Sequence, residues 1–400
     1  MKTKTTKPSE RQAILEERRN LKMARSAHAY VRGNTLKFYE WLESGAGKQI
    51  PEGPPVWICG DCHVGNLGPV ANVKGRVAIA IRDLDQTVVG NPAHDLIRLG
   101  LSIATAARGS DLPGVTTAHA LEHMMEGYQE ALAHPDRDYT DFEKMPKPIR
   151  LLLKQATKRE WRHLAEERLE DVKPSIPLGD CFWALSNEEK KDIGRLLETK
   201  EARHLVTSLH SREDDATIQV VDAAYWMKGC SSLGRLRYAV LLQIGKEGEL
   251  CLIDIKEAIQ AAAPRTHLGV MPTNNAQRVV EGARKLSPYL GERMLAANLL
   301  NRDVFIRELM PQDLKLELAQ LTREEATLAA RYLATVVGKA HGRQIDVVTR
   351  NKWSAELRRH RATNLDAPSW LWTSVVQLVA SHEAAYLDHC RNYAMRKTLR

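Results

Sequence analysis

The pattern of hydrophobic and polar positions divides the chain into a helical part, a strand-rich part and a second helical part. Residues 9–45 have apolar positions at helical spacing, with an interruption near residues 32–34. From about residue 216 the period changes, and from Thr322 to the end the helical period returns. Three glycine-separated segments rich in β-branched or aromatic residues predict a local β-sheet: "TIQVVDAAYWMKG", "RLRYAVLLQIG" and "ELCLIDIKEA".

Shorter signals add detail to this division. Two apolar runs bounded by turn residues, "VWIC" and "RVAIAI", predict buried strands before residue 90. Asn91 is a good helix cap and Pro92 suits the first helical position, so a helix is predicted to begin there. Residues 115–210 are predicted to be mostly helical, and the sheet is followed by a helix, "AQRVVEGARKL", and a strand, "DVFIREL". Capping boxes are predicted at two further helix starts, Ser186 with Glu189 and Thr322 with Glu325.

The composition is that of an ordinary globular protein. The 400 residues are 43% hydrophobic and 27% charged, enough for two or three domains or one large two-lobed body. No apolar run is long enough to cross a bilayer and no signal peptide is visible, so we expect a cytoplasmic protein without a membrane partner. Four of the six cysteines are widely scattered, which is not the pattern of a disulfide framework.

The charge is mildly basic. There are 58 basic and 50 acidic residues, for a net charge of +8, which permits an anionic ligand without requiring one. Aromatic residues make up 6% and no nucleic-acid-binding motif is visible, so we do not expect a nucleic-acid partner.

Residues 58–68 read "ICGDCHVGNLG" and allow four interpretations. Cys59, Cys62 and His63 spell a c-type haem attachment site, but such sites belong to exported proteins. A structural zinc site normally needs four ligands, and no second C-x-x-C pair exists here. Thiol redox chemistry places its cysteines at the start of a helix, whereas the glycines that follow here predict a loop. The redox interpretation is kept as an alternative.

The fourth interpretation is G-D-x-H-x-x-N, with Asp61 five residues before Asn66. One strand later, Asp83 and Asp85 follow an apolar run. Phosphoryl transfer uses one aspartate to take the proton of the acceptor hydroxyl, and an asparagine and a second aspartate to hold Mg²⁺ against the phosphates. Oxygen ligands suit Mg²⁺, whereas thiolates do not.

The segment "GDCHVGNLG … IRDLDQTVVGNPAHDL" resembles the catalytic core of the aminoglycoside phosphotransferase and choline kinase branch of the protein-kinase-like superfamily. The resemblance implies that Asp61 is the catalytic base and that Asn66 and Asp83 hold the metal. Asp85 is a further candidate metal ligand. The resemblance also implies that Asp95 is a structural aspartate that supports the loop.

Two positions depart from the pattern of that branch. Cys59 replaces the usual first histidine, and Asn91 replaces the aspartate of G-D-P. Neither position supplies the base or a metal ligand in that pattern, so the implied chemistry is unchanged.

Most of the chain also resembles an uncharacterised bacterial family, domain of unknown function 2252. The segments "YVRGN", "GDCHVGNLG", "GCSSLGRLRY", "DIKEA" and "RVVEGAR" occur in the order found in that family. This resemblance brings no known activity.

A kinase-like enzyme needs a β-rich lobe with a glycine-rich loop and a strand lysine, and the helical residues before Asp61 do not supply one. Candidates occur later in the chain. "GCSSLGRLRYAVLL" leads from a glycine-rich turn into a strand, and "LCLIDIKEA" places Lys256 at the end of the next strand. Glu281, in the following helix, is predicted to pair with Lys256. The predicted nucleotide-binding residues are Gly229, Ser231, Ser232, Gly234, Lys256 and Glu281.

We therefore predict an α+β protein with a two-lobed protein-kinase-like fold that is circularly permuted. A mostly helical large lobe would be joined to a small antiparallel β-sheet lobe. Residues 1–215 would form the large lobe with its catalytic and metal loops, 216–320 the nucleotide-binding small lobe, and 321–400 helices that return to the large lobe. Such a rearrangement is physically reasonable because chain termini often lie close together at domain surfaces.

The predicted function is ATP- and Mg²⁺-dependent phosphoryl transfer to a hydroxyl acceptor that the sequence does not identify. The alternatives are a non-catalytic nucleotide-binding regulator on the same fold, and a thiol-redox protein that uses Cys59 and Cys62. The sequence leaves open the oligomeric state, the choice between phosphoryl and nucleotidyl transfer, and the roles of Arg32 and His63.

Overall fold

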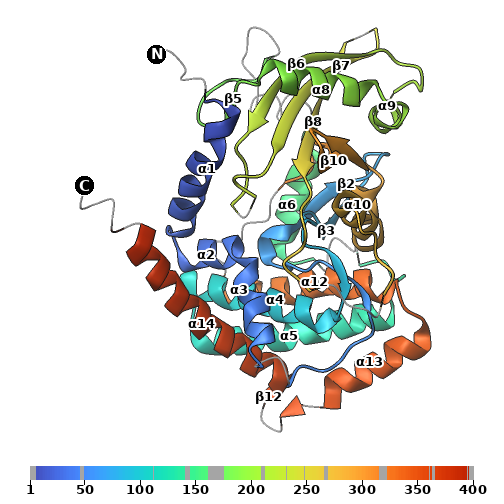
Figure 1. Ribbon diagram of the computed structural model, residues 1–400. Helices are drawn as coiled ribbons and strands as arrows, with labels where there is room; N and C mark the ends of the chain where they lie inside the picture. The colour runs from blue at the N-terminus through green and yellow to red at the C-terminus, as the bar shows by residue number, and fades with distance from the viewer. Residues whose placement is uncertain are drawn as a thin grey trace.

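In the computed structural model of the protein, the main sheet has six antiparallel strands in the order β5-β6-β7-β8-β10-β9 (Figure 1). The strands are β5 (Phe182–Trp183), β6 (Ile218–Trp226), β7 (Arg237–Ile244), β8 (Glu249–Glu257), β9 (Met294–Leu299) and β10 (Arg302–Glu308). The structure describes residues 6–45, 49–110, 112–139, 145–160, 175–208, 212–230, 232–246, 248–264, 269–314, 322–359, 361–362, 365–393 and 395. The predicted strands of this region are present, and the chain is an α+β protein as predicted.

Side chains along each strand alternate between the two faces of the sheet. One face is apolar and packs against α8 (Asn187–Glu198) and α9 (Lys200–Thr207). Its buried residues include Tyr238, Val240, Ile253 and Ile255. The two helices were assigned to the large lobe by the predicted boundary at residue 215, but they pack with the sheet. An amphipathic helix has the same sequence pattern whether it covers a sheet or another helix, so the pattern could not place them.

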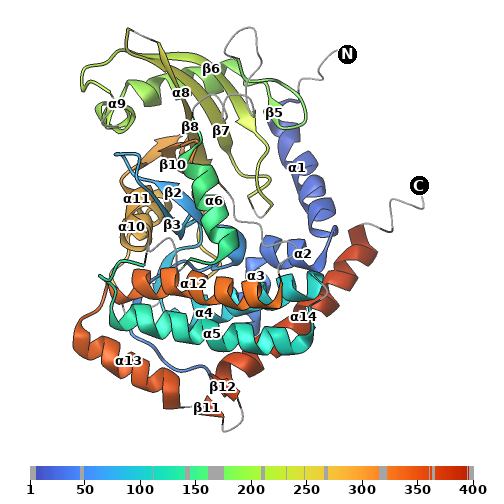
Figure 2. The same cartoon turned by 180° about the vertical axis from the view of Figure 1, so that it is seen from behind.

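The second part of the molecule consists of helices packed side by side below the sheet (Figure 2). They are α2 (Ala27–Gly33), α3 (Thr35–Glu43), α4 (Pro92–Gly109), α5 (Gly114–Ala133), α12 (Arg323–Gly342), α13 (Val347–Arg359) and α14 (Ser369–Tyr393). The helix α6 (Lys147–Thr157) stands more upright, between α12 and the sheet. The predicted caps are present: Asn91 accepts a hydrogen bond from the Ala93 amide, and both capping boxes form. Among the helices that the structure describes, none is long and apolar enough to pass through a membrane.

Small residues allow α5 and α12 to pack closely. A Cβ added to Gly127 of α5 would lie 2.2 Å from the main-chain oxygen of Arg331 in α12. A Cβ on Gly338 of α12 would lie 2.4 Å from the main-chain oxygen of Tyr128. Since neither backbone leaves room for a side chain at these points, the two glycines set the distance between the helices.

Two small antiparallel pairs lie between the sheet and the helices: β1 (Val56–Ile58) with β4 (Val88–Gly90), and β2 (Leu67–Ala71) with β3 (Val77–Ile81). β1 and β3 were predicted, whereas the stretch that forms β2 was predicted to be a loop. It contains Gly68 and Pro69, which disfavour strands, and its pairing with β3 overrides that local preference. β4, β5 and β9 were also missed, as was the pair β11 (Arg361–Ala362) and β12 (Leu365–Pro368) within the C-terminal helical region.

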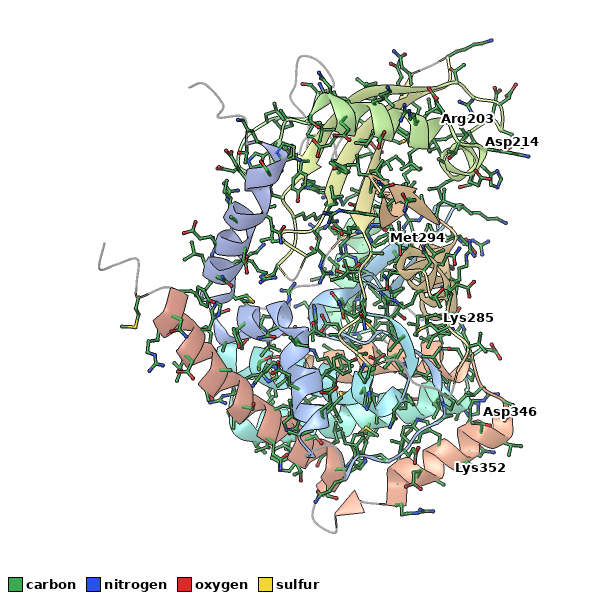
Figure 3. All side chains as sticks on the ribbon, in the orientation of Figure 1. Arg203, Asp214, Lys285, Met294, Asp346 and Lys352 are labelled. Atoms are coloured by element: carbon green, nitrogen blue, oxygen red, sulfur yellow. The ribbon has the colours of Figure 1, made fainter. Side chains whose placement is uncertain are left out.

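The first helix, α1 (Pro8–Met23), connects the two parts of the molecule (Figure 1). Its buried Arg11 forms an ion pair with Glu189 of α8, with 2.6 Å between Nη1 and Oε1. Side chains occupy the region between the sheet and the helices, while Asp214 lies at the outer edge of the sheet part (Figure 3).

Candidate functional site

The loop between β1 and β2 is held from below by Asp95, near the start of α4. Asp95 accepts hydrogen bonds from the amides of Cys59 at 2.7 Å and Gly60 at 3.0 Å, and its Oδ2 lies 3.2 Å from Nε2 of His341. All of these groups are buried. Asp95 therefore fixes the backbone just before Asp61, which is the supporting position expected of it.

Asp61 itself is buried and forms an ion pair with an arginine of α4. Arg98 of α4 donates from Nε to Asp61 Oδ1 at 2.8 Å, and from Nη2 to the main-chain oxygen of Val31 at 2.6 Å. Nε2 of His63 lies 3.9 Å from Asp61 Oδ2. Burial lowers the pKa of His63 to about 3, so this imidazole is neutral near pH 7. Arg98 is a partner of Asp61 that the sequence did not reveal, because 37 residues separate the two.

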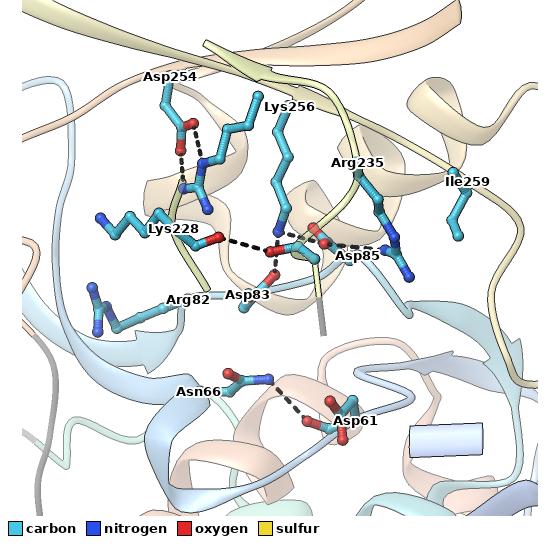
Figure 4. Close-up of polar contacts among 12 residues, drawn as sticks. Asp61, Asn66, Arg82, Asp83, Asp85, Lys228, Arg235, Asp254, Lys256 and Ile259 are labelled. Carbon is cyan, nitrogen blue, oxygen red and sulfur yellow. Dashed lines mark hydrogen bonds and ion pairs between the residues drawn. The ribbon is translucent and has the colours of Figure 1, made fainter. Parts of the chain in front are cut away.

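Asn66 lies beside Asp61 at the end of the same loop. Its Nδ2 donates to the main-chain oxygen of Asp61 at 3.0 Å (Figure 4). This bond fixes the orientation of the amide, and within the described residues no donor binds its Oδ1. An oriented amide oxygen of this kind is a suitable ligand for a hard cation.

The structure brings Lys256 of β8 together with the acidic pair that follows β3 (Figure 4). Lys256 Nζ lies 3.5 Å from Oδ1 of Asp83 and also contacts Oδ2 of Asp85. The Lys256 side chain is 3% exposed and that of Asp85 12%, whereas that of Asp83 is 49% exposed. Residues separated by 173 positions in the sequence thus meet between the sheet and the loops, with one carboxylate open to solvent.

The two carboxyl groups differ in their electrostatic surroundings. Desolvation works against ionisation of Asp83, but Lys256 and Arg307 outweigh it and hold the pKa of Asp83 well below its usual range. Burial and the neighbouring Asp83 carboxylate raise the pKa of Asp85. Oδ1 of Asp85 is buried and has no hydrogen-bond partner in the described part of the chain.

The glycine-containing turn between β6 and β7 lies next to this group. Gly229 and Gly234 have φ angles of 96° and 97°, a conformation that other residues adopt only with strain. Lys22 of α1 donates to the main-chain oxygen of Gly229 at 2.7 Å, and Ser232 Oγ donates to that of Lys228 at 3.2 Å. Ser231, also predicted to bind nucleotide, lies outside the described residues.

The predicted pair between Lys256 and Glu281 does not form. Glu281 is exposed on α10 (Asn275–Leu286), and the ion pairs of Lys256 that the structure describes are those with the acidic pair. A different residue of α10 faces the site: Arg278 donates to the main-chain oxygens of Asp85 at 3.0 Å and Thr87. The helix presents the face of Arg278 to this segment, and Glu281 lies off that face.

A second charged network lies on the same face of the sheet as Lys256. Arg237 of β7 donates to both carboxylate oxygens of Asp254, at 2.8 and 2.6 Å, and Arg307 of β10 donates to it at 3.0 Å. Although burial opposes ionisation of Asp254, these two arginines hold its pKa below the usual range. In the sequence, the only indication of this network is that Asp254 and Lys256, two residues apart on a strand, point to the same face of the sheet.

Cys59 and Cys62 are buried free thiols. The contact with Cys62, followed by burial, raises the pKa of Cys59 well above the ordinary thiol value. The contact with Cys59 lowers the pKa of Cys62, but burial together with the Asp95 and Asp61 carboxylates outweighs it, and the net change is upward. Redox-active thiols need a depressed pKa and access, and these have neither. Across the described residues, no group of three or more His, Cys, Asp or Glu side chains is arranged to hold a metal ion.

Arg32, whose role the sequence left open, packs on the loop. A Cβ on Gly65 would lie 2.9 Å from the Arg32 guanidinium carbon, so the guanidinium lies directly against the loop backbone and would have to shift for a larger residue. Nε of Arg32 is buried without a hydrogen-bond partner among the described residues.

Comparison with known proteins identifies the family. A family model described as "Uncharacterized protein conserved in bacteria (DUF2252)" matches residues 11–392. The chain belongs to this family. The membership of DUF2252 that was predicted from the sequence is thus confirmed over most of the chain. Neither a curated protein nor a solved structure matches it, so no activity is transferred from a relative.

Proposed function

We propose that this DUF2252 protein is an ATP- and Mg²⁺-dependent phosphotransferase with a permuted kinase-like fold. The observation that carries the proposal is the contact of Lys256 with Asp83 and Asp85. A nucleoside triphosphate needs a cation beside its phosphates and a carboxylate that holds its metal ion. A sheet lysine that faces an aspartate would supply both.

The order of elements supports the kinase-like interpretation. The strand pair β6–β7 carries the glycine turn, β8 carries Lys256, and α10 leads to the pair β9–β10, whose last strand lies beside β8. After β10 the chain continues to α12 in the helical part. The catalytic loop and the acidic pair come from the N-terminal 90 residues instead of following the sheet, as the permuted order requires.

The residues present fit a magnesium ion. Asn66, Asp83 and Asp85 would hold it, since they offer amide and carboxylate oxygens, and Asp85 Oδ1 is buried without a hydrogen bond from the described residues. Mg²⁺ is commonly bound by one or two carboxylates together with substrate phosphates and water, so a larger protein cluster is not needed. The ion would neutralise phosphate charge in the reaction.

Asp61 would orient the acceptor and take its hydroxyl proton. Arg98 occupies Oδ1 and holds the carboxylate in place, which leaves Oδ2 as the oxygen that faces the proton. His63 is neutral near pH 7 and buried, so it does not compete as a strong cationic partner. Lys256 would hold the donor phosphates in an orientation suitable for transfer.

The test compares the wild-type protein with Asp83→Asn, using thermal stabilisation by Mg·ATP and turnover of ATP. The matched control is Asp214→Asn, at an exposed position at the outer edge of the sheet part (Figure 3). The proposal predicts that Asp83→Asn loses both responses and that the control keeps them. Nucleotide binding without turnover in the wild type would favour the non-catalytic regulator. Identical behaviour of all three proteins would exclude a metal–nucleotide role for Asp83.

A further inference from the structure

A small cavity lies beside the acidic pair, where β10 leads back toward the helical part. Its volume is about 60 Å³. Figure 4 shows Arg82 and Lys228 extending to the same side of the acidic pair, away from Arg235. Of the described residues that line the cavity, four are cationic and one is acidic: Arg82, Arg159, Lys228, Arg307 and Asp313.

The acidic groups near the cavity already have cationic partners. Both carboxylate oxygens of Asp313 lie 3.1 Å from Nη2 of Arg293. Arg307 shares the Asp254 carboxylate with a second arginine. Arg82 donates to the main-chain oxygen of Asp313 at 2.8 Å, which is a neutral acceptor. Among the described residues, positive charge therefore exceeds negative charge around the cavity.

Two of the cationic residues that line the cavity, Arg82 and Arg307, are in direct contact. Nη1 of Arg307 donates to the main-chain oxygen of Arg82 at 3.3 Å, so the two cationic residues are held together. A bound anion would relieve the repulsion between them.

We propose that this cavity binds a phosphate group of a ligand. Guanidinium groups bind phosphate oxygens in paired hydrogen bonds, and a lysine adds a mobile point charge. A cavity of about 60 Å³ has room for more than one water-sized group and therefore for one phosphate group. Binding of an anion by these residues does not require the phosphotransferase activity, whereas the choice between the two ligands considered next rests on the proposed function.

Two sources share this chemistry. The phosphate belongs either to the nucleotide that donates the transferred group or to a phosphorylated acceptor. The cavity lining includes Arg82, which directly precedes Asp83 in the chain, so either ligand would extend from the cavity toward the acidic pair.

The experiment titrates sodium pyrophosphate, without metal, into the full-length protein by calorimetry at constant ionic strength. The test variant is Lys228→Gln with Arg159→Gln, since both side chains are only half-buried and the fold should tolerate the change. The control is Lys191→Gln, an exposed lysine of α8. We expect the double variant to bind pyrophosphate at least about tenfold more weakly than the wild type, because a tenfold change in affinity corresponds to the loss of about one charge-assisted hydrogen bond. The control should bind pyrophosphate like the wild type.

Equal affinity in all three proteins, or the same loss in the control as in the double variant, would overturn the proposal, because binding would then depend on overall charge alone. Asp83→Asn separates the two proposals: it should keep the pyrophosphate affinity even if Mg·ATP binding is lost or was never present. Competition of pyrophosphate with Mg·ATP would assign the cavity to the donor. Simultaneous binding would assign it to a phosphorylated acceptor.

Discussion

Replacing Lys256 by Met tests the contact between the sheet and the acidic pair without assuming any activity. Methionine fills much of the volume of the lysine stem but removes its charge. The ammonium contacts Asp85, and both side chains are largely buried, at 3% and 12% exposure. Breaking a buried pair by removing one partner costs about 3–5 kcal/mol, because the other charge remains without compensation. Arg235 lies 3.9 Å from Asp85 and compensates in part, so we expect the lower end, about 3 kcal/mol.

A double-mutant cycle isolates the pair. Urea unfolding would be followed by circular dichroism for the wild type, Lys256→Met, Asp85→Asn and the combined variant, with equal denaturant slopes as the condition for comparison. In the combined variant residue 85 is neutral, so removal of the Lys256 ammonium no longer leaves the Asp85 carboxylate buried without a partner. The combined variant should therefore be less destabilised, by at least about 1.5 kcal/mol, than the sum of the two single variants. Lys191→Met, at an exposed position, should change stability by less than about 0.5 kcal/mol.

The refuting result is additivity. If the two single changes sum to the effect of the combined variant within about 0.5 kcal/mol, Lys256 and Asp85 do not interact in the folded protein. The placement of the sheet against the loops would then be wrong.

Two further predictions concern the supports of the site. Burial raises the pKa of Glu189, but the hydrogen bonds and charge of Arg11 act against burial and the net pKa is lowered. The pair therefore stabilises the fold at pH values above the unfolded pKa of about 4.3, and this contribution is lost as the pH falls below it. The stability difference between the wild type and Glu189→Gln, measured by urea unfolding, should therefore be largest near pH 7 and shrink between pH 5 and 3; a constant difference would show that the charge is not involved. Gly127→Ala should destabilise by about 2 kcal/mol or more in thermal unfolding, because its Cβ would meet a main-chain oxygen of α12 at 2.2 Å. Gly194→Ala, in α8 with no atom within 4 Å of the added Cβ, should instead stabilise by about 0.5–1 kcal/mol, and a loss at both sites would contradict the steric explanation.

The sequence predicted the elements whose local signals agree with their final environment. β8 with Lys256 near its end has strong strand propensity and follows a glycine-containing turn, and α4 begins at a clear cap. β2 could not be predicted, since Gly68 and Pro69 oppose a strand locally and only the pairing with β3 creates one.

The charged partners of the site were harder to predict than its acidic residues. Asp61 and Asp83 stand out because their spacing matches a known pattern, but Arg98 meets Asp61 only through the packing of α4. Glu281 shows the reverse error: its spacing from Lys256 was reasonable, yet the rotation of α10 directs Arg278 toward the loop instead. Helix rotation depends on tertiary packing, which one sequence does not determine.

The most direct test of the central claim is a crystal structure of the protein with Mg²⁺ and a nonhydrolysable ATP analogue. The account predicts the phosphates next to the ammonium of Lys256 and the metal on the carboxylate of Asp83. A nucleotide bound elsewhere, with Lys256 still paired to Asp85, would contradict it.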